Sequence, residues 1–114
     1  MQDCIFCKII NRDIPSDIIY EDEEILAFKD INPVAPVHII FIPKKHICCI
    51  NMLEDDDANL IGKIFIKIKE VAKQLGIADN GYRIINNCGD DAGQTVKHIH
   101  FHIIGGRNLG LKLI

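Results

Sequence analysis

His98-Ile99-His100-Phe101-His102-Ile103-Ile104 is the stretch of this 114-residue chain that decides its fold, because histidines and apolar residues alternate along it. Successive side chains of a β-strand point to opposite faces, so the spacing predicts a strand with three imidazoles on one face and apolar side chains on the other. Neighbouring imidazoles would lie roughly 6.6 Å apart, which is two strand rises. An ordinary solvent-facing strand would carry Lys, Thr or Glu there, so the pattern favours a buried anchor with a chemically active face.

The loop directly before this strand, residues 88–95, is rich in glycine and aspartate. Small residues let backbone N–H groups approach an anion closely, which would suit a phosphate. An ordinary hairpin loop has the same composition, and the sequence does not separate the two readings. The chain carries neither GxxxxGK[ST] nor GxGxxG, so it has no P-loop and no dinucleotide-binding fingerprint.

Further from the triad, apolar runs bounded by turn residues predict strands at 18–21, 25–28, 37–42 and 81–87. The first two make a hairpin around a short acidic turn. Residues 4–10 form a short apolar run that we expect to be one or two helical turns.

A long helix should fill the space between 51 and 76, with Asn51 as its cap and Gly76 at its end. Its buried face is predicted from helical spacing to hold Leu60, Ile61, Ile64, Phe65, Ile68, Val71, Ala72 and Leu75. Ile66 lies beside Gly62 on the otherwise charged opposite side, which indicates a second contact surface.

Composition limits the function classes. Residues 1–114 are enough for one domain with a modest core, and apolar residues make up 48% of the chain. The net charge of −3 argues against a nucleic-acid surface, and no apolar run reaches membrane-spanning length. We therefore expect a cytoplasmic protein without nucleic-acid or membrane partners. Five cysteines, an odd number, favour reduced thiols or metal ligands over a disulfide framework.

Several residues outside the triad are ambiguous when taken alone. Cys4 and Cys7 have half of a zinc-site spacing, but they could equally be reduced core residues. Asp30 begins a stiff loop where it could bind a ligand hydroxyl or form an Asx-turn. His38 shares a mostly apolar strand face, where a histidine is more often a hydrogen-bonded core residue than a catalytic one.

The triad motif resembles the histidine triad (HIT) family, whose pattern is His, apolar, His, apolar, His, apolar, apolar. The residues at 27–33, 42–46, 93–96 and 105–107 resemble the Hint branch, which comprises purine nucleoside phosphoramidases. The resemblance extends along nearly the whole chain. It implies an α+β, HIT-like fold in which a five-stranded antiparallel sheet carries one short and one long helix, and it implies a homodimer.

The resemblance also implies roles for individual residues. The catalytic positions are His100 as the nucleophile, with His102 and His38 near the phosphate. The substrate-binding positions are Ile5, Phe6, Phe28 and Ile31 around a purine base, Asp30 at the ribose hydroxyls, and Asn87, Gly93, Gln94, Thr95 and His102 around the phosphate. Some family members bind zinc through a CxxC pair and two histidines. Here the set would be Cys4, Cys7, His46 and His98, a closed structural zinc site.

The residue chemistry agrees with the implied activity. Neutral imidazole attacks phosphorus well and would give a nucleotidyl-histidine intermediate, and a flanking histidine or water could protonate the leaving amine. This chemistry requires no metal. We therefore expect a hydrolase that cleaves the P–N bond of purine nucleoside 5'-phosphoramidates. The alternatives are a dinucleoside polyphosphate hydrolase, a nucleotide-binding regulatory module with vestigial activity, and a zinc-binding structural protein.

Overall fold

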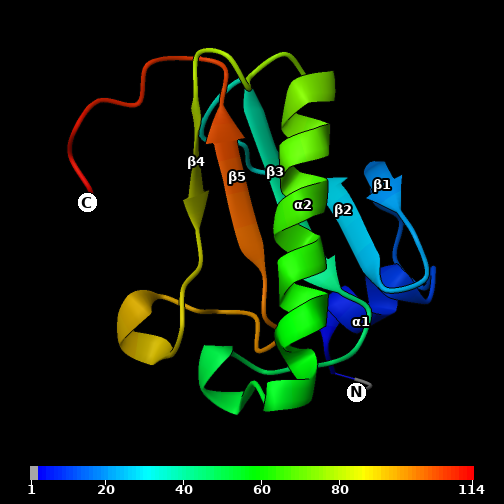
Figure 1. Cartoon of the computed structure of the whole chain (residues 1–114). Coiled ribbons are helices and arrows are strands. Elements are labelled where there is room, and N and C mark those ends of the chain that lie inside the picture. Colours follow the sequence, from blue (N-terminus) through cyan, green and yellow to red (C-terminus); the bar gives the residue numbers. More distant parts are fainter. Residues whose placement is uncertain (1–2) are drawn as a thin grey trace.

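A five-stranded antiparallel sheet forms the centre of the computed structural model, which describes residues 3–114 (Figure 1). The strand order is β1-β2-β3-β5-β4, so β1 and β4 are the two edges of this sheet. Each neighbouring pair is antiparallel, as predicted. The strands are β1 Ile18–Glu21, β2 Ile25–Lys29, β3 Val37–Pro43, β4 Tyr82–Ile85 and β5 Phe101–Gly105.

The two faces of the sheet carry different helices. The long helix α2, Ala58–Gln74, packs on one face and buries alternate residues of β2, β3 and β5 (Figure 1). The short helix α1, Ile5–Ile10, packs on the other face, where Phe6 and Ile9 join the intervening residues of β2 and β3. These strands are therefore buried on both sides along part of their length. In the part of the chain that the structure describes, no helix is both long and apolar enough to cross a membrane.

The triad strand begins later than predicted, because β5 starts at Phe101 and not at His98. The register opposes Phe41 to Phe101, so Ile99 would face Pro43. Proline has no N–H to donate to a ladder, and the N–H of Ile99 instead donates to the carbonyl of Ile47 (2.7 Å). The chain continues through His98 and His100, but regular pairing with β3 has ended there.

Strand β4 is also shorter than the predicted 81–87. The side-chain amide of Asn86 donates to the carbonyl of His100 (2.8 Å), a group that a longer ladder would pair with a backbone N–H. At the other end of the pair, β5 stops at Gly105. Gly106 follows with φ of 92°, and a Cβ there would lie 2.9 Å from Pro36, so this position requires glycine.

Asn51 does not cap the long helix, contrary to the prediction. It lies in a 3-10 turn, Ile50–Met52, and a second 3-10 turn, Asp55–Asp57, precedes α2. A capping box between Glu54 and Asp57 closes this second 3-10 turn, and α2 begins at the next residue. The acidic cluster thus stabilises the turn that leads into α2, whereas Asn51 lies in the earlier 3-10 turn.

Helix α2 ends as predicted, with Gly76 at φ of 77° just after its last turn. Its apolar face is narrower than predicted, because Phe65 and Leu75 are 43% and 37% exposed. Ile66 is 51% exposed, so Phe65 and Ile66 form an apolar patch on the outer side of α2.

We predict that Asp57→Asn lowers the melting temperature at pH 7 by roughly 5 °C. The Asp57 carboxylate accepts from Lys45 (2.6 Å) and from the Glu54 N–H (2.9 Å), and the Lys45 bond, aided by that of Glu54, holds its pKa below the ordinary value. The stabilisation is therefore present above the unfolded carboxyl pKa of about 3.9 and is lost as the pH falls through the lower, folded value.

Thermal unfolding followed by circular dichroism between pH 3 and pH 7 measures this effect. The gap between variant and wild type should shrink at the acid end. Asp56→Asn, at the exposed neighbouring carboxylate, is the matched control and should change little. A gap that is undiminished at pH 3 would show that the carboxylate charge is not its cause.

Candidate functional site

His100 is held so that one ring nitrogen faces the protein and the other is available. Its Nδ1 lies 2.8 Å from the carbonyl of His98, and since a carbonyl only accepts, Nδ1 carries the proton. Nε2 of the neutral ring therefore keeps its lone pair. The residue is 6% exposed, and burial lowers the pKa of His100 below its ordinary value. Geometry and burial both favour the neutral form that a nucleophile requires.

A chain of hydrogen bonds fixes the opposite tautomer in His102. The N–H of Val34 donates to Nδ1 of His38 (3.2 Å), so the ring proton of His38 lies on Nε2. That N–H faces Nδ1 of His102 (2.9 Å), which must accept. His102 consequently carries its proton on Nε2. The ring centroids of His100 and His102 are 5.1 Å apart, so a ring with a lone pair on Nε2 lies beside a ring with a proton on Nε2.

Asp30 forms the Asx-turn that the sequence allowed, and it uses only one of its carboxylate oxygens for that turn. Its Oδ1 accepts from the N–H of Asn32 (2.7 Å), which is the Asx-turn. Its Oδ2 faces the histidines, 3.3 Å from His38 Nε2 and 4.0 Å from His102 Nδ1. The turn fixes one oxygen and leaves the other directed at the site. These three side chains also have the composition of a metal site, but the proton on His38 Nε2 occupies the position that a metal would take.

Of the four residues expected around a base, Phe6 packs against His100 and Phe28 packs against Phe6, whereas the other two are exposed. The ring of Phe6 meets His100 edge-on, with centroids 5.1 Å apart, and meets Phe28 in the same way at 5.6 Å. Both phenylalanines are buried. Ile5 is 45% exposed and Ile31 is 89% exposed, so neither belongs to the packed layer.

The four residues expected around a phosphate, besides His102, lie in the chain between β4 and β5. Gln94 is 3% exposed, and its amide is fully used: Oε1 accepts from the Gly89 N–H (2.9 Å), while Nε2 donates to the carbonyls of Cys48 (2.7 Å) and Val96 (3.1 Å). Its side chain therefore braces this loop. Gly93, with φ of 80°, and Thr95 are exposed, and Asn87 is half-buried just beyond β4.

Asn86 is a site residue that the sequence reasoning missed. Its amide supports the carbonyl of His100, as described above. Its Oδ1 is buried and has no donor within residues 3–114. The paired asparagines at 86 and 87, next to the expected phosphate position, were the available signal. They do not reveal which of the two points back to the triad.

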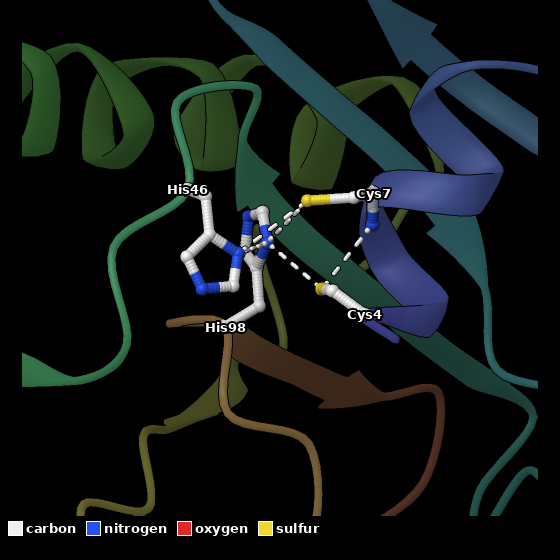
Figure 2. A group of neighbouring side chains, drawn as sticks. All are labelled: Cys4, Cys7, His46 and His98. Carbon is white, nitrogen blue, oxygen red and sulfur yellow. Dashed lines mark hydrogen bonds between the residues drawn. The ribbon is translucent and has the colours of Figure 1, made fainter. Parts of the chain in front are cut away.

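A second cluster lies beside the triad and could hold a metal ion. Cys4, Cys7, His46 and His98 come from the start of α1, from the segment after β3 and from the approach to β5, and their side chains converge (Figure 2). Their ligand atoms all lie within 4.8 Å of one another. All five cysteines of the chain are free thiols, so Cys4 and Cys7 are both available as ligands.

The hydrogen bonds of this cluster leave its ligand atoms directed inward. Nε2 of His98 donates to the carbonyl of Pro43 (2.8 Å), so Nδ1 keeps its lone pair and faces the thiols. Burial lowers the pKa of His98 to about 4, which keeps the ring neutral. Burial, with the adjacent Cys4, raises the pKa of the Cys7 thiol to about 11, so a cation would be needed to hold the thiolate.

Comparison with known proteins agrees with this geometry. Residues 11–109 match the family model described as the HIT domain. A purine nucleoside phosphoramidase of Escherichia coli K12 is 45% identical over 109 residues, covering 96% of this chain and 92% of that protein. A HIT-like protein of Synechocystis is 51% identical over 93% of this chain and 92% of its own length.

Solved structures give the same result at the level of the backbone. A HIT family hydrolase from Clostridium thermocellum superposes with a TM-score of 0.97 at 49% identity, covering 100% of this chain and 99% of that one. A histidine triad protein from Clostridium difficile gives a TM-score of 0.95 at 47% identity, with 98% and 97% covered. The alternating histidines, the sheet that carries them and these matches show that the chain belongs to the HIT family.

Proposed function

We propose that this protein hydrolyses purine nucleoside 5'-phosphoramidates by a nucleotidyl-histidine mechanism. The observation that carries the proposal is the opposite protonation of two adjacent rings. His100 offers an Nε2 lone pair, and His102 offers an Nε2–H donor. A nucleophile beside a proton donor suits attack on phosphorus with departure of an amine. The name of the Escherichia coli relative supports the substrate class.

In the proposed reaction, His100 Nε2 attacks the phosphorus and the P–N bond breaks. The leaving nitrogen takes both electrons of that bond and a proton from His102 or from water. A water molecule then attacks the phosphorus and returns a proton to the group that protonated the amine, the electrons of the His100–P bond return to Nε2 as that bond breaks, and the nucleoside monophosphate leaves. The N–H of His102 would stabilise charge on the phosphoryl oxygens as His100 attacks. His38 would act through His102 by fixing its tautomer.

Substrate binding would divide between the neighbouring groups. Phe6 and Phe28 would contact one side of the base, and the exposed side chains of Ile5 and Ile31 would have to close over it. Oδ2 of Asp30 would accept from a ribose hydroxyl. The loop from Asn87 to Thr95 would approach the phosphate. Within that loop, Gln94 would act as a brace, because its amide is already satisfied.

We also propose that the Cys4–Cys7–His46–His98 cluster binds zinc. Tetrahedral zinc with Zn–S of about 2.3 Å and Zn–N of about 2.05 Å implies N···N edges of about 3.3 Å and S···N edges of about 3.6 Å. The His46–His98 nitrogens are 3.2 Å apart, and three of the four sulfur–nitrogen pairs are 3.4, 3.4 and 3.6 Å apart. A site with four protein ligands leaves no position for substrate, so zinc would stabilise the fold without taking part in the chemistry.

A homodimer through α2 and β4 is our third proposal. Strand β4 is an edge of the sheet, and edge strands present unpaired backbone groups. Phe65 and Ile66 form the exposed apolar patch on α2. A second copy placed against this side would cover both the edge strand and the patch.

His100→Ala should abolish turnover of an adenosine phosphoramidate, lowering kcat by at least about 10³-fold. Nucleotide affinity should fall little, because the phenylalanines and Asp30 remain in place. Steady-state kinetics and calorimetry with AMP measure the two effects. Near-wild-type turnover by this variant would exclude a covalent intermediate on His100.

The same assay with a diadenosine polyphosphate separates the proposed reaction from its nearest rival. We expect kcat/KM to favour the phosphoramidate. A preference for the polyphosphate would reassign the substrate class. Tight nucleotide binding without turnover of either compound would favour the regulatory module.

Protein purified without chelator should contain about one equivalent of zinc per chain, as expected for a closed site of two cysteines and two histidines. Cys4→Ser and Cys7→Ser should lose the ion and melt at lower temperature, because α1 would lose its link to the sheet. Elemental analysis and thermal unfolding measure these effects. Cys49→Ser, outside the cluster, is the matched control. Well under one equivalent in wild type, with no change in the two variants, would refute the zinc site.

Ile66→Glu should weaken the dimer by at least tenfold in dissociation constant, on the order of 1.4 kcal/mol, because it would bury a charge in the contact. Val34→Glu is the control, since Val34 is a similarly exposed apolar residue in the loop between β2 and β3. Sedimentation velocity over a concentration series measures both variants. A wild-type chain that is monomeric at micromolar concentration would contradict the proposal.

A further inference from the structure

His98 belongs to both clusters at once. Its ring Nδ1 lies among the cluster thiols, 3.4 Å from Cys4 and 3.6 Å from Cys7. Its backbone carbonyl accepts the Nδ1–H of His100. The ring also donates to the carbonyl of Pro43, so its orientation is fixed from two directions. A displacement of the His98 side chain would therefore reach the carbonyl that orients His100.

Helix α1 provides a second connection between the two clusters. Phe6 lies between Cys4 and Cys7 in the sequence, and its ring meets both His98 and His100 edge-on, at 5.9 and 5.1 Å. The helix has six residues, too few to be stable without its tertiary contacts. The position of the Phe6 ring thus depends on the tertiary contacts of α1, which are those of the two cysteines and the apolar packing of the helix on the sheet.

The backbone of His100 has a support of its own. Asn86 donates to the carbonyl of His100 from the end of strand β4, which contains no member of the cysteine–histidine cluster. The peptide of His100 is therefore anchored independently of the cluster. Its imidazole, in contrast, is oriented by His98, which is a member of the cluster, and by Phe6, which packs against His98.

The cluster can also be reached from solvent. A cavity of about 520 Å³ is lined by Cys4 and His46, together with Ile5 and residues 95–97 before β5. Two of the four ligands therefore border open space. An ion could enter or leave here without unfolding of the sheet.

We propose that the Cys4–Cys7–His46–His98 cluster is a metal-dependent positioning device for His100. With an ion bound, the His98 carbonyl and the Phe6 ring hold the imidazole as the Nδ1–H tautomer with the lone pair on Nε2. Without the ion, both supports loosen, while the backbone of His100 stays in place through its bond from Asn86. The inference rests on the proposed zinc site and nucleophile, and it assigns the site a role beyond a structural link.

Nuclear magnetic resonance of protein with ¹⁵N-labelled histidine tests the inference. Long-range ¹H–¹⁵N spectra report the tautomer of each ring. In zinc-loaded protein, His100 should show a single tautomer with its proton on Nδ1. After the ion is removed by a chelator, the His100 signals should move toward a mixture of tautomers, and kcat should fall on the order of tenfold. Adding Zn²⁺ back should restore both readouts.

Two variants complete the experiment. Cys7→Ser should show the mixed His100 signals and should not be restored by zinc, whereas Cys49→Ser should behave as wild type. If the His100 signals stay unchanged after the ion has left, the positioning role is wrong. A loaded protein that shows the single tautomer but turns over no phosphoramidate would instead disprove the proposed function and leave the positioning role standing.

Cadmium provides the test if the metal-free chain unfolds. Cd²⁺ is larger than Zn²⁺ and forms longer bonds to the same ligands, so it should displace the His98 ring while keeping the chain folded. The His100 ring resonances and kcat should then differ between the cadmium and zinc forms. Identical resonances in the two forms, or failure of the protein to bind either ion, would overturn the inference.

Discussion

The hydrogen bond from His100 Nδ1–H to the carbonyl of His98 is the interaction on which the site depends. This hydrogen bond exists because the ladder between β3 and β5 begins only at Phe101 and does not include His98. Pro43 has no N–H to donate, so its carbonyl accepts from the ring of His98 and the chain around residue 99 pairs elsewhere. Had regular pairing continued, the backbone of His98 would have been committed to the sheet. The interruption leaves its carbonyl available to orient the next histidine.

Three histidines acquire two different tautomers from their neighbours. His98 donates through Nε2 and has a lone pair on Nδ1, whereas His100 donates through Nδ1 and has a lone pair on Nε2. His102 accepts through Nδ1 from His38 and so carries its proton on Nε2. Burial lowers the pKa of all three, which keeps these neutral tautomers in place at physiological pH. The fold thus gives one repeated residue type two tautomers and three different sets of hydrogen-bond partners.

The sequence by itself determined the periodic features of this protein. Alternation at 98–104 and turn-bounded apolar runs predicted the strands, and helical spacing predicted α2, because side-chain direction follows from backbone repeat alone. The family resemblance indicated which histidines would form the triad site and which cysteines and histidines would form the metal cluster. The element boundaries were predicted less accurately. Strand β5 starts late opposite Pro43, and β4 ends before Asn86. A 3-10 turn with an acidic capping box, and not Asn51, directly precedes α2.

Only the tertiary structure decided how these residues act. It showed that the two oxygens of Asp30 are used differently, that Gln94 is a brace, and that Asn86 supports His100. It also showed that His98 belongs to both the triad and the cysteine cluster. Ring tautomers depend on donors and acceptors from distant segments, such as the Val34 N–H and the Pro43 carbonyl. A linear pattern specifies which groups are present, whereas the proton positions follow from which of those groups the fold places within hydrogen-bonding distance.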